Sequence, residues 1–245
     1  FPRDVDAMLY LSQAMQAVAI KTGVECWRAQ RPNCMGTLYW QLNDNWPVAS
    51  WSSIEYGGKW KQLHYHMRRL YAPLAVMGLA DDRIAAVNDT AEPVDATVDV
   101  ERWSFDGRIL GSKTVTATLP ADGVFTWKGD EAIPADADEP SFLTMTLRTA
   151  SGTYQNEWFF GRYKQYDLAN AKVRVSVDGF RVTLTTDAPA FFVWANARGV
   201  PGEFSDNSFT LLPSRPTEID FTPKGEVSAD AFAQALSVMH LRQTY

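Results

Sequence analysis

GTLYWQL, residues 36–42, is the stretch that decides the predicted fold. It is apolar and aromatic without polar alternation, which is typical of a strand buried on both faces of a parallel sheet. A lone strand of this kind leaves unpaired N–H and C=O groups on both edges, and each one that is buried costs about 1–3 kcal/mol. We therefore expect other strands to pair with residues 36–42.

Apolar residues at helical spacing flank this stretch on both sides. Those before it predict a helix over residues 5–28, stopped by Pro32, with an apolar stripe of Met8, Leu11, Met15, Val18 and Ala19. Those after it predict a second helix that ends before Pro73, with a stripe of Trp60, Leu63, Met67 and Leu70. A helix, a buried strand and a second helix are typical of folds built on a parallel sheet.

Beyond Leu74 the period of the apolar residues changes from 3.6 to 2, which predicts short strands. The predicted strands are 94–100, 115–119, 142–147, 154–160, 172–177, 180–185, 190–195, 208–212 and 218–221, followed by a short helix within 228–236. Glycine-containing turns such as Asp106-Gly107 separate them, which is typical of antiparallel β-sandwiches. The predicted domains are residues 1–72, 73–164 and 165–245.

Composition excludes several classes of function. The 23 basic and 29 acidic residues give a net charge of −6, so no positive field gathers nucleic acid. No apolar stretch approaches the roughly 20 residues of a membrane helix. Cys26 and Cys34 form neither a disulfide framework nor a zinc pattern, so we expect no metal and no cofactor. Because the first residue is Phe1 rather than Met, we expect the natural polypeptide to begin further upstream.

Tryptophans and amide or carboxylate side chains crowd the end of the predicted parallel strand. Trp40, Asn43, Asp44 and Trp46 all lie there, where the loops of parallel sheets converge on ligands. Indole faces stack on the apolar face of a sugar ring, and amides and carboxylates bind its hydroxyls. The pattern predicts a carbohydrate site; the alternative is that these tryptophans only fill a core.

Three stretches resemble β-mannosidases of glycoside hydrolase family 2. GTLYWQLNDNWPVASWSSIEYGGKWKQLHYHMRRLYAP, residues 36–73, is similar to their last barrel strand and helix. MLYLSQAMQAVAI, residues 8–20, is similar to the helix before that strand, and APAFFVWANARGVPGEFSDNSFTLLP, residues 188–213, to their final Ig-like domain. The resemblance implies a multidomain fold: the end of a (β/α)8 TIM barrel followed by two Ig-like antiparallel β-sandwiches. Residues 74–162 are placed by order alone.

The resemblance implies that the parent is a retaining exo-acting glycoside hydrolase that removes terminal non-reducing β-D-mannose. Such chemistry uses two carboxyl groups about 5 Å apart. In the family both glutamates precede the helix that opens this chain, so we expect no catalytic residue here and no activity of the chain alone. Glu55 and Glu157 match neither motif and are expected at the surface.

Binding residues and partners follow from the same resemblance. Trp40 is expected to line the subsite for the cleaved mannose, with a cis peptide bond after it, and Asn43, Asp44 and Trp46 to shape the adjoining loop. The expected partners are a β-mannoside or manno-oligosaccharide substrate and the missing amino-terminal part of the same protein. The sequence leaves open whether the sandwiches form a homodimer. It also leaves the cellular compartment open, because relatives occur in bacteria and in lysosomes.

Other features carry weaker predictions. His64 and His66 are two apart on a predicted helix, about 200° around its axis, so they cannot share a metal; we expect one packed and one exposed. Asn88-Asp89-Thr90 is a glycosylation sequon at a predicted strand edge. An alternative function is a carbohydrate-binding module with an exposed strip of Trp103, Trp127 or Trp158, and another is a purely structural role for the sandwiches.

Overall fold

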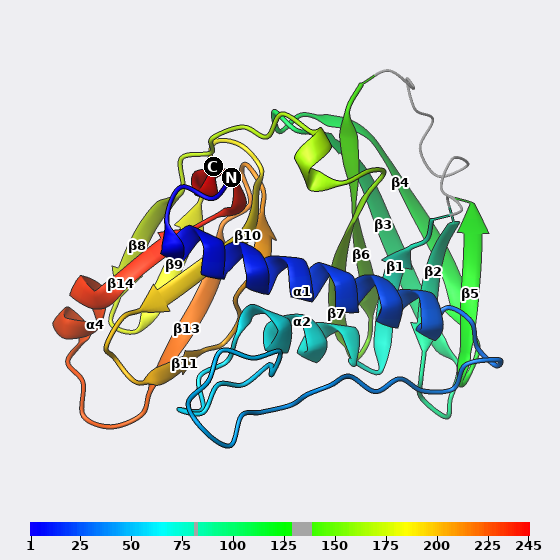
Figure 1. Ribbon diagram of the computed structural model, residues 1–245. Coiled ribbons are helices and arrows are strands. Elements are labelled where there is room, and N and C mark those ends of the chain that lie inside the picture. The colour runs from blue at the N-terminus through cyan, green and yellow to red at the C-terminus, as the bar shows by residue number, and fades with distance from the viewer. Residues whose placement is uncertain (81–82, 129–138) are drawn as a thin grey trace. The chain divides into compact units, whose positions relative to one another are not determined.

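The computed structural model describes residues 1–80, 83–128 and 139–245 (Figure 1). The chain forms two compact units. The C-terminal unit combines Phe1–Ile20, Tyr39–Met67 and Leu168–Tyr245, and the central unit combines Lys21–Leu38 with Arg68–Asp167. The predicted three-domain division stays a prediction; its middle segment includes residues 81–82 and 129–138, which lie outside the described residues.

Both predicted helices are present. Helix α1 spans Val5–Arg28 and helix α2 spans Gln62–Leu70. Asp4 Oδ1 accepts a hydrogen bond from Ala7 N at 2.7 Å, which satisfies an otherwise unpaired donor of the first turn. Within the described residues, no helix is long and apolar enough to cross a membrane.

The predicted apolar stripe of α1 is wrong. The buried residues of its first four turns, also three or four apart, are Ala7, Tyr10, Ala14 and Ala17, and Val24, Glu25 and Arg28 are buried further along. Met8 and Met15, which the stripe placed inside, are exposed. Alanine lets a helix backbone approach its neighbours closely, so a row of alanines can form the packed face although larger apolar residues lie beside it.

The central unit is a sandwich of two antiparallel sheets. One sheet has the order β1-β2-β5, in which β1 is Leu74–Gly78, β2 is Arg83–Asn88 and β5 is Gly123–Lys128. The other sheet has the order β4-β3-β6-β7, in which β4 is Ile109–Leu119, β3 is Val94–Ser104, β6 is Ser141–Thr149 and β7 is Gly152–Phe159. A short 3-10 helix, η1, follows at Tyr163–Gln165. The predicted alternation holds in β3, where Ala96, Val98 and Val100 are buried in the core shared with Leu74 and Ile84 of the first sheet.

The C-terminal unit contains a second sandwich. One sheet has the order β11-β13-β9-β8, from Gly202–Phe204, Thr217–Pro223, Arg181–Thr185 and Arg174–Asp178. The other has the order β12-β10-β14, from Phe209–Leu211, Ala190–Ala197 and Leu236–Met239. Helix α4, Ala229–Ala235, begins at an N-cap, Ser228, whose hydroxyl accepts from Ala231 N at 3.1 Å. A 3-10 helix, η2, covers Leu241–Thr244.

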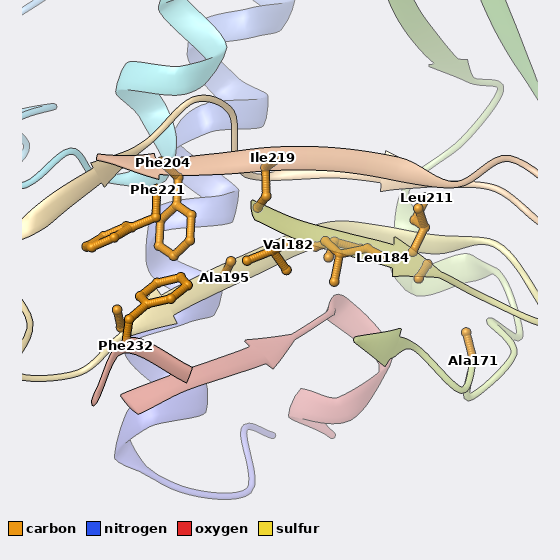
Figure 2. Packing of buried hydrophobic residues seen from close by; sticks show 12 residues of the cluster. Ala171, Val182, Leu184, Ala195, Phe204, Leu211, Ile219, Phe221 and Phe232 are labelled. Carbon is orange, nitrogen blue, oxygen red and sulfur yellow. The ribbon is translucent and has the colours of Figure 1, made fainter. Parts of the chain in front are cut away.

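Aromatic rings close one end of this sandwich. Figure 2 shows Phe204, Phe221 and Phe232 gathered around one another. The ring centroids of Phe221 and Phe232 are 4.6 Å apart and those of Phe204 and Phe221 are 4.9 Å apart. Phe232 comes from α4, so burial of this one ring fastens the short helix to the sheets.

Residues 36–42 are not a buried strand, so that prediction is wrong for this chain. The stretch has no assigned strand, and Leu38 is 96% exposed. Its continuation makes only an isolated parallel bridge, between Asn43 and Ile54. Among the described residues no neighbouring strand supplies the ladder that a buried parallel strand requires, although Ile54 N donates to Leu42 O and Tyr71 OH donates to Thr37 O.

Candidate functional site

Residues 40–61 form a loop that is held by internal hydrogen bonds. We call this segment the Trp40 loop. Asp44 N donates to Ile54 O at 3.1 Å, and Ile54 N donates to Leu42 O at 2.8 Å. Lys61 N donates to Ser53 O at 2.9 Å, which brings the end of the loop back to its middle. These backbone bonds fix the position of the chain that follows Trp40.

Asp44 organises this loop from inside. Its carboxylate accepts hydrogen bonds from Ser50 Oγ at 2.6 Å and Ser52 Oγ at 2.5 Å, and lies 3.5 Å from Lys61 Nζ. The two hydroxyl donors, followed by Lys61, lower the pKa of Asp44. The side chain is buried and engaged within the loop. This geometry suits the expected loop-shaping role, and contact of Asp44 with a sugar stays a prediction.

Ser53 ties the loop to α2. Its fully buried hydroxyl lies 2.9 Å from Leu42 O, 2.9 Å from Tyr39 OH and 3.0 Å from His64 Nδ1. A carbonyl can only accept, so the single proton of Ser53 points to Leu42, and Tyr39 and His64 donate to the oxygen. Ser53 was not predicted from the sequence. The signal that could have found it is the cluster of serines at 50, 52 and 53 among the tryptophans.

Three indoles of the Trp40 loop face solvent. Trp40 is 73% exposed, Trp46 63% and Trp51 61%, so the alternative that these rings fill a core is wrong. The peptide bond between Trp40 and Gln41 is cis, as the family resemblance predicted. Trp51 Nε1 donates to Gln41 Oε1 at 3.1 Å, which links this ring to the residue that follows Trp40.

Asn43 is exposed beside them. Its Nδ2 donates to Asp44 O at 3.2 Å, and its own carbonyl accepts from Gln41 Nε2 at 2.9 Å. Of the four predicted binding residues, Trp40, Asn43 and Trp46 therefore present side chains to solvent, and only Asp44 is turned inward. The exposed set combines indole faces with an amide, which is chemistry suited to a sugar.

His64 and His66 of α2 lie in different environments. His66 is buried with Nε2 3.1 Å from Ser208 Oγ, whereas His64 is only half-buried. The expected packed residue is thus His66, but His64 is less exposed than predicted because Ser53 holds it. In the described part of the chain, no three His, Cys, Asp or Glu side chains are grouped to hold a metal ion. Cys26 and Cys34 are free thiols.

The glycosylation sequon at Asn88 is buried. Asn88 is fully buried at the end of β2, and its Nδ2 donates to Glu92 O at 2.8 Å and Pro120 O at 3.1 Å. Its Oδ1 accepts from Thr90 N and from the Thr90 hydroxyl. The side chain stabilises a turn, and the predicted strand-edge acceptor is not accessible in the folded chain.

The strip predicted for a carbohydrate-binding module does not exist as proposed. Trp103 is 3% exposed and donates through Nε1 to Thr144 Oγ1 at 3.1 Å. Trp127 and Trp158 are partly buried and pack against the core of the central unit. A binding strip needs exposed coplanar rings, which these three do not provide. Glu55 is exposed as expected, and Glu157 is half-buried.

Comparison with known proteins gives concordant results. A Mannosidase Ig/CBM-like domain matches residues 83–165, and the Ig-fold domain of the Ig_mannosidase family matches residues 165–244. A curated β-mannosidase of Capra hircus is 33% identical over 97% of this chain, which spans 30% of that protein. The crystal structure of a β-D-mannosidase from Dictyoglomus thermophilum has a TM-score of 0.80 and 27% identity, with 98% of this chain and 30% of that chain covered.

An exo-chitosanase from Amycolatopsis orientalis shares the fold, with a TM-score of 0.71 at 17% identity over 94% of this chain and 33% of its own. The chain thus spans about a third of the length of the proteins it matches. The two matched regions include the strands of the C-terminal sandwich and those of the central sandwich except β1. The chain is thus similar to β-mannosidases along 97% of its length, and two of its regions match Ig-like domain families of the mannosidase type.

Proposed function

We propose that this chain is the carboxy-terminal part of a retaining exo-β-mannosidase of glycoside hydrolase family 2. Residues 1–72 complete its catalytic (β/α)8 barrel, and Trp40 lines the subsite for the terminal β-D-mannose. The proposal is supported by similarity to a β-mannosidase along 97% of this chain. The chain covers 30% of that protein.

One observation carries the barrel part of this proposal: every second residue of the apolar stretch 36–42 is exposed. Leu38, Trp40 and Leu42 are all exposed, and large exposed apolar side chains mark a surface that another element covers. Neighbouring barrel strands on both edges satisfy its backbone groups and cover these side chains. Exposed Met8 and Met15 on α1 are then covered in the same way.

The chemistry divides between the two parts of the parent. Retaining hydrolysis needs an acid/base and a nucleophilic carboxyl about 5 Å apart, and this chain supplies neither. Trp40 supplies the flat surface against which the sugar ring stacks. Asn43 and Trp46 contribute to the same wall, and Asp44 holds the loop that carries them through Ser50 and Ser52.

Hydrolysis of 4-nitrophenyl β-D-mannoside tests the proposal. The chain alone is expected to be inactive, and the complete parent polypeptide to be active. In the complete protein Trp40→Ala is expected to lower kcat/KM about 100-fold, the cost of a misplaced substrate. Trp27→Ala removes another exposed indole and is the matched control. Turnover by the isolated chain, or equal losses in the two variants, contradicts the proposal.

A further inference from the structure

A pocket of about 210 Å³ opens in the C-terminal unit. It is lined by one face of α1, by part of residues 55–62 and by strands β10 and β14. Trp194 and Asn196 are two apart on β10, so they share a face of the sheet. Met239 and Ser237 of β14 pair directly with them. None of the four predicted binding residues of the Trp40 loop lines this pocket.

Two indoles form its apolar walls, Trp60 from the loop and Trp194 from β10. Both pack edge-on against Tyr65, with centroid distances of 5.1 and 5.8 Å and interplanar angles of 62° and 79°. Tyr65 is buried, so it fixes the orientation of both rings. Each indole is only half-buried, and indole surface is left for a ligand.

Hydrogen-bonding groups stand beside the rings. Lys59 Nζ donates to Asn196 Oδ1 at 2.6 Å. Within residues 1–80, 83–128 and 139–245, the other Nζ protons of Lys59 and the Nδ2 protons of Asn196 have no partner. Ser237 Oγ donates to Asn196 O at 3.2 Å and can still accept, and the exposed Glu55 carboxylate also lines the pocket.

The charges favour a neutral ligand over an anion. Arg198 pairs with Asp6 at 2.9 Å, and Lys61 lies 3.5 Å from Asp44. The remaining cation of the pocket is Lys59, and the negative charge of Glu55 acts on it. The pocket is also smaller than the roughly 300–1,000 Å³ of sites for drug-sized ligands. Flat rings, both donors and acceptors, and compensated charge in a small volume match a single sugar ring.

We propose that this Trp194 pocket binds one neutral pyranose unit of an oligosaccharide. The C–H face of the sugar packs against the indoles of Trp60 and Trp194, and its hydroxyls bind Lys59, Asn196 and Glu55. This site does not depend on the proposed subsite at Trp40, because none of the residues predicted for that subsite lines the pocket.

Indole N–H signals in ¹H–¹⁵N NMR spectra of the 245-residue chain test this site directly. Titration with β-1,4-mannobiose is expected to shift the signals of Trp60 and Trp194 with a Kd on the order of 1 mM. The signal of buried Trp103 is expected to stay in place, and inorganic phosphate to produce no shift at equal concentration. Unmoved Trp60 and Trp194 signals overturn the proposal, and equal shifts with phosphate overturn the neutral-sugar class.

Variants separate binding in this pocket from binding at Trp40. Trp194→Ala is expected to weaken mannobiose binding roughly tenfold through loss of an aromatic contact. Because Trp194 also packs on Tyr65, Asn196→Ala is the second variant, with an expected loss of about fivefold. In Trp40→Ala, the shift of the Trp194 signal is expected to persist. Disappearance of the Trp194 shift in Trp40→Ala, or unchanged Kd values in both pocket variants, overturns the proposal. Loss of mannosidase activity through Trp40→Ala in the complete parent, with the Trp194 shift intact in the same variant of the 245-residue chain, separates the two sites.

Discussion

Ser208 donates a hydrogen bond of 2.8 Å to Gln62 Oε1 and so joins the loop before β12 to the first residue of α2. Both side chains are buried. Gln62 Nε2 donates in turn to Tyr10 O at 3.0 Å, which links α1 to the same network. Since the hydroxyl proton of Ser208 points to Gln62, the contact of 3.1 Å with His66 Nε2 requires the hydrogen on that nitrogen.

Ser208→Ala is expected to destabilise the C-terminal unit by about 1–3 kcal/mol, because the buried Gln62 oxygen loses its donor. Urea unfolding measures the effect. A double-mutant cycle with Gln62→Leu is expected to give a coupling of about 0.5–3 kcal/mol. Ser176→Ala, at an exposed position of β8, is the control. Equal stabilities of the Ser208 and Ser176 variants contradict the prediction.

Glu25→Gln is expected to change how stability depends on pH. Burial raises the pKa of Glu25, although Lys21 Nζ at 2.8 Å and Asn156 Nδ2 at 2.6 Å partly offset it. With the folded pKa above the unfolded value of about 4.3, the contribution of Glu25 is full below that value and is lost as pH rises through the folded pKa.

Chemical denaturation between pH 4 and 7 checks this sign. The wild type is expected to gain stability relative to Glu25→Gln as the pH falls across this range. Glu92→Gln removes an exposed carboxylate of the same unit and is expected to show no such gain. A difference between wild type and Glu25→Gln that is constant with pH contradicts the prediction.

Asp44→Asn is expected to loosen the Trp40 loop. An amide offers one oxygen where the carboxylate accepts from Ser50 and Ser52, and it loses the charge that faces Lys61. Hydrogen exchange of the backbone amides of Ile54 and Lys61 is expected to accelerate at neutral pH. Glu226→Gln, at an exposed site, is the control; unchanged protection in Asp44→Asn counts against an organising role.

The pH dependence of the same loop has the opposite sign to that of Glu25. The pKa of Asp44 is lowered, so its stabilising contribution is present above the unfolded value of about 3.9 and is lost as pH falls through the folded pKa. Protection factors of the loop amides in the wild type are expected to fall under acid conditions, and those of Asp44→Asn to vary less. Parallel profiles for the two proteins are the contrary result.

Gly78→Ala is expected to destabilise the central unit by about 1–3 kcal/mol through overpacking. A Cβ at this position of β1 collides with Trp158 Cγ, and Trp158 is packed against the core. Gly36→Ala is the matched control, because a Cβ there meets no atom within 4 Å. Thermal unfolding compares the two, and an unchanged Tm for Gly78→Ala shows that the strand can shift away.

Local patterns determined much of the secondary structure. The helix predicted over residues 5–28 is found as Val5–Arg28, alternation located β3, and strands predicted at 142–147 and 190–195 lie within β6 and β10. Strands β1 and β2 were not predicted because nearly every position in them is buried, which removes the alternation that identifies a strand. The tryptophan-rich composition beside Trp40 left a sugar-binding surface and a filled core both open, and the exposure of Trp40, Trp46 and Trp51 came from the structure.

Only the tertiary structure decided which groups meet. The sequence placed Met8 on the packed face of α1, but the approach of neighbouring elements buried Ala7 instead. Asp44 turned inward because Ser50 and Ser52 curve back to it. The Trp194 pocket joins α1, the Trp40 loop and β10 across more than 180 residues of chain. Periodicity records the environment of a residue and its near neighbours; contacts between distant segments arise from packing and leave no local pattern to read.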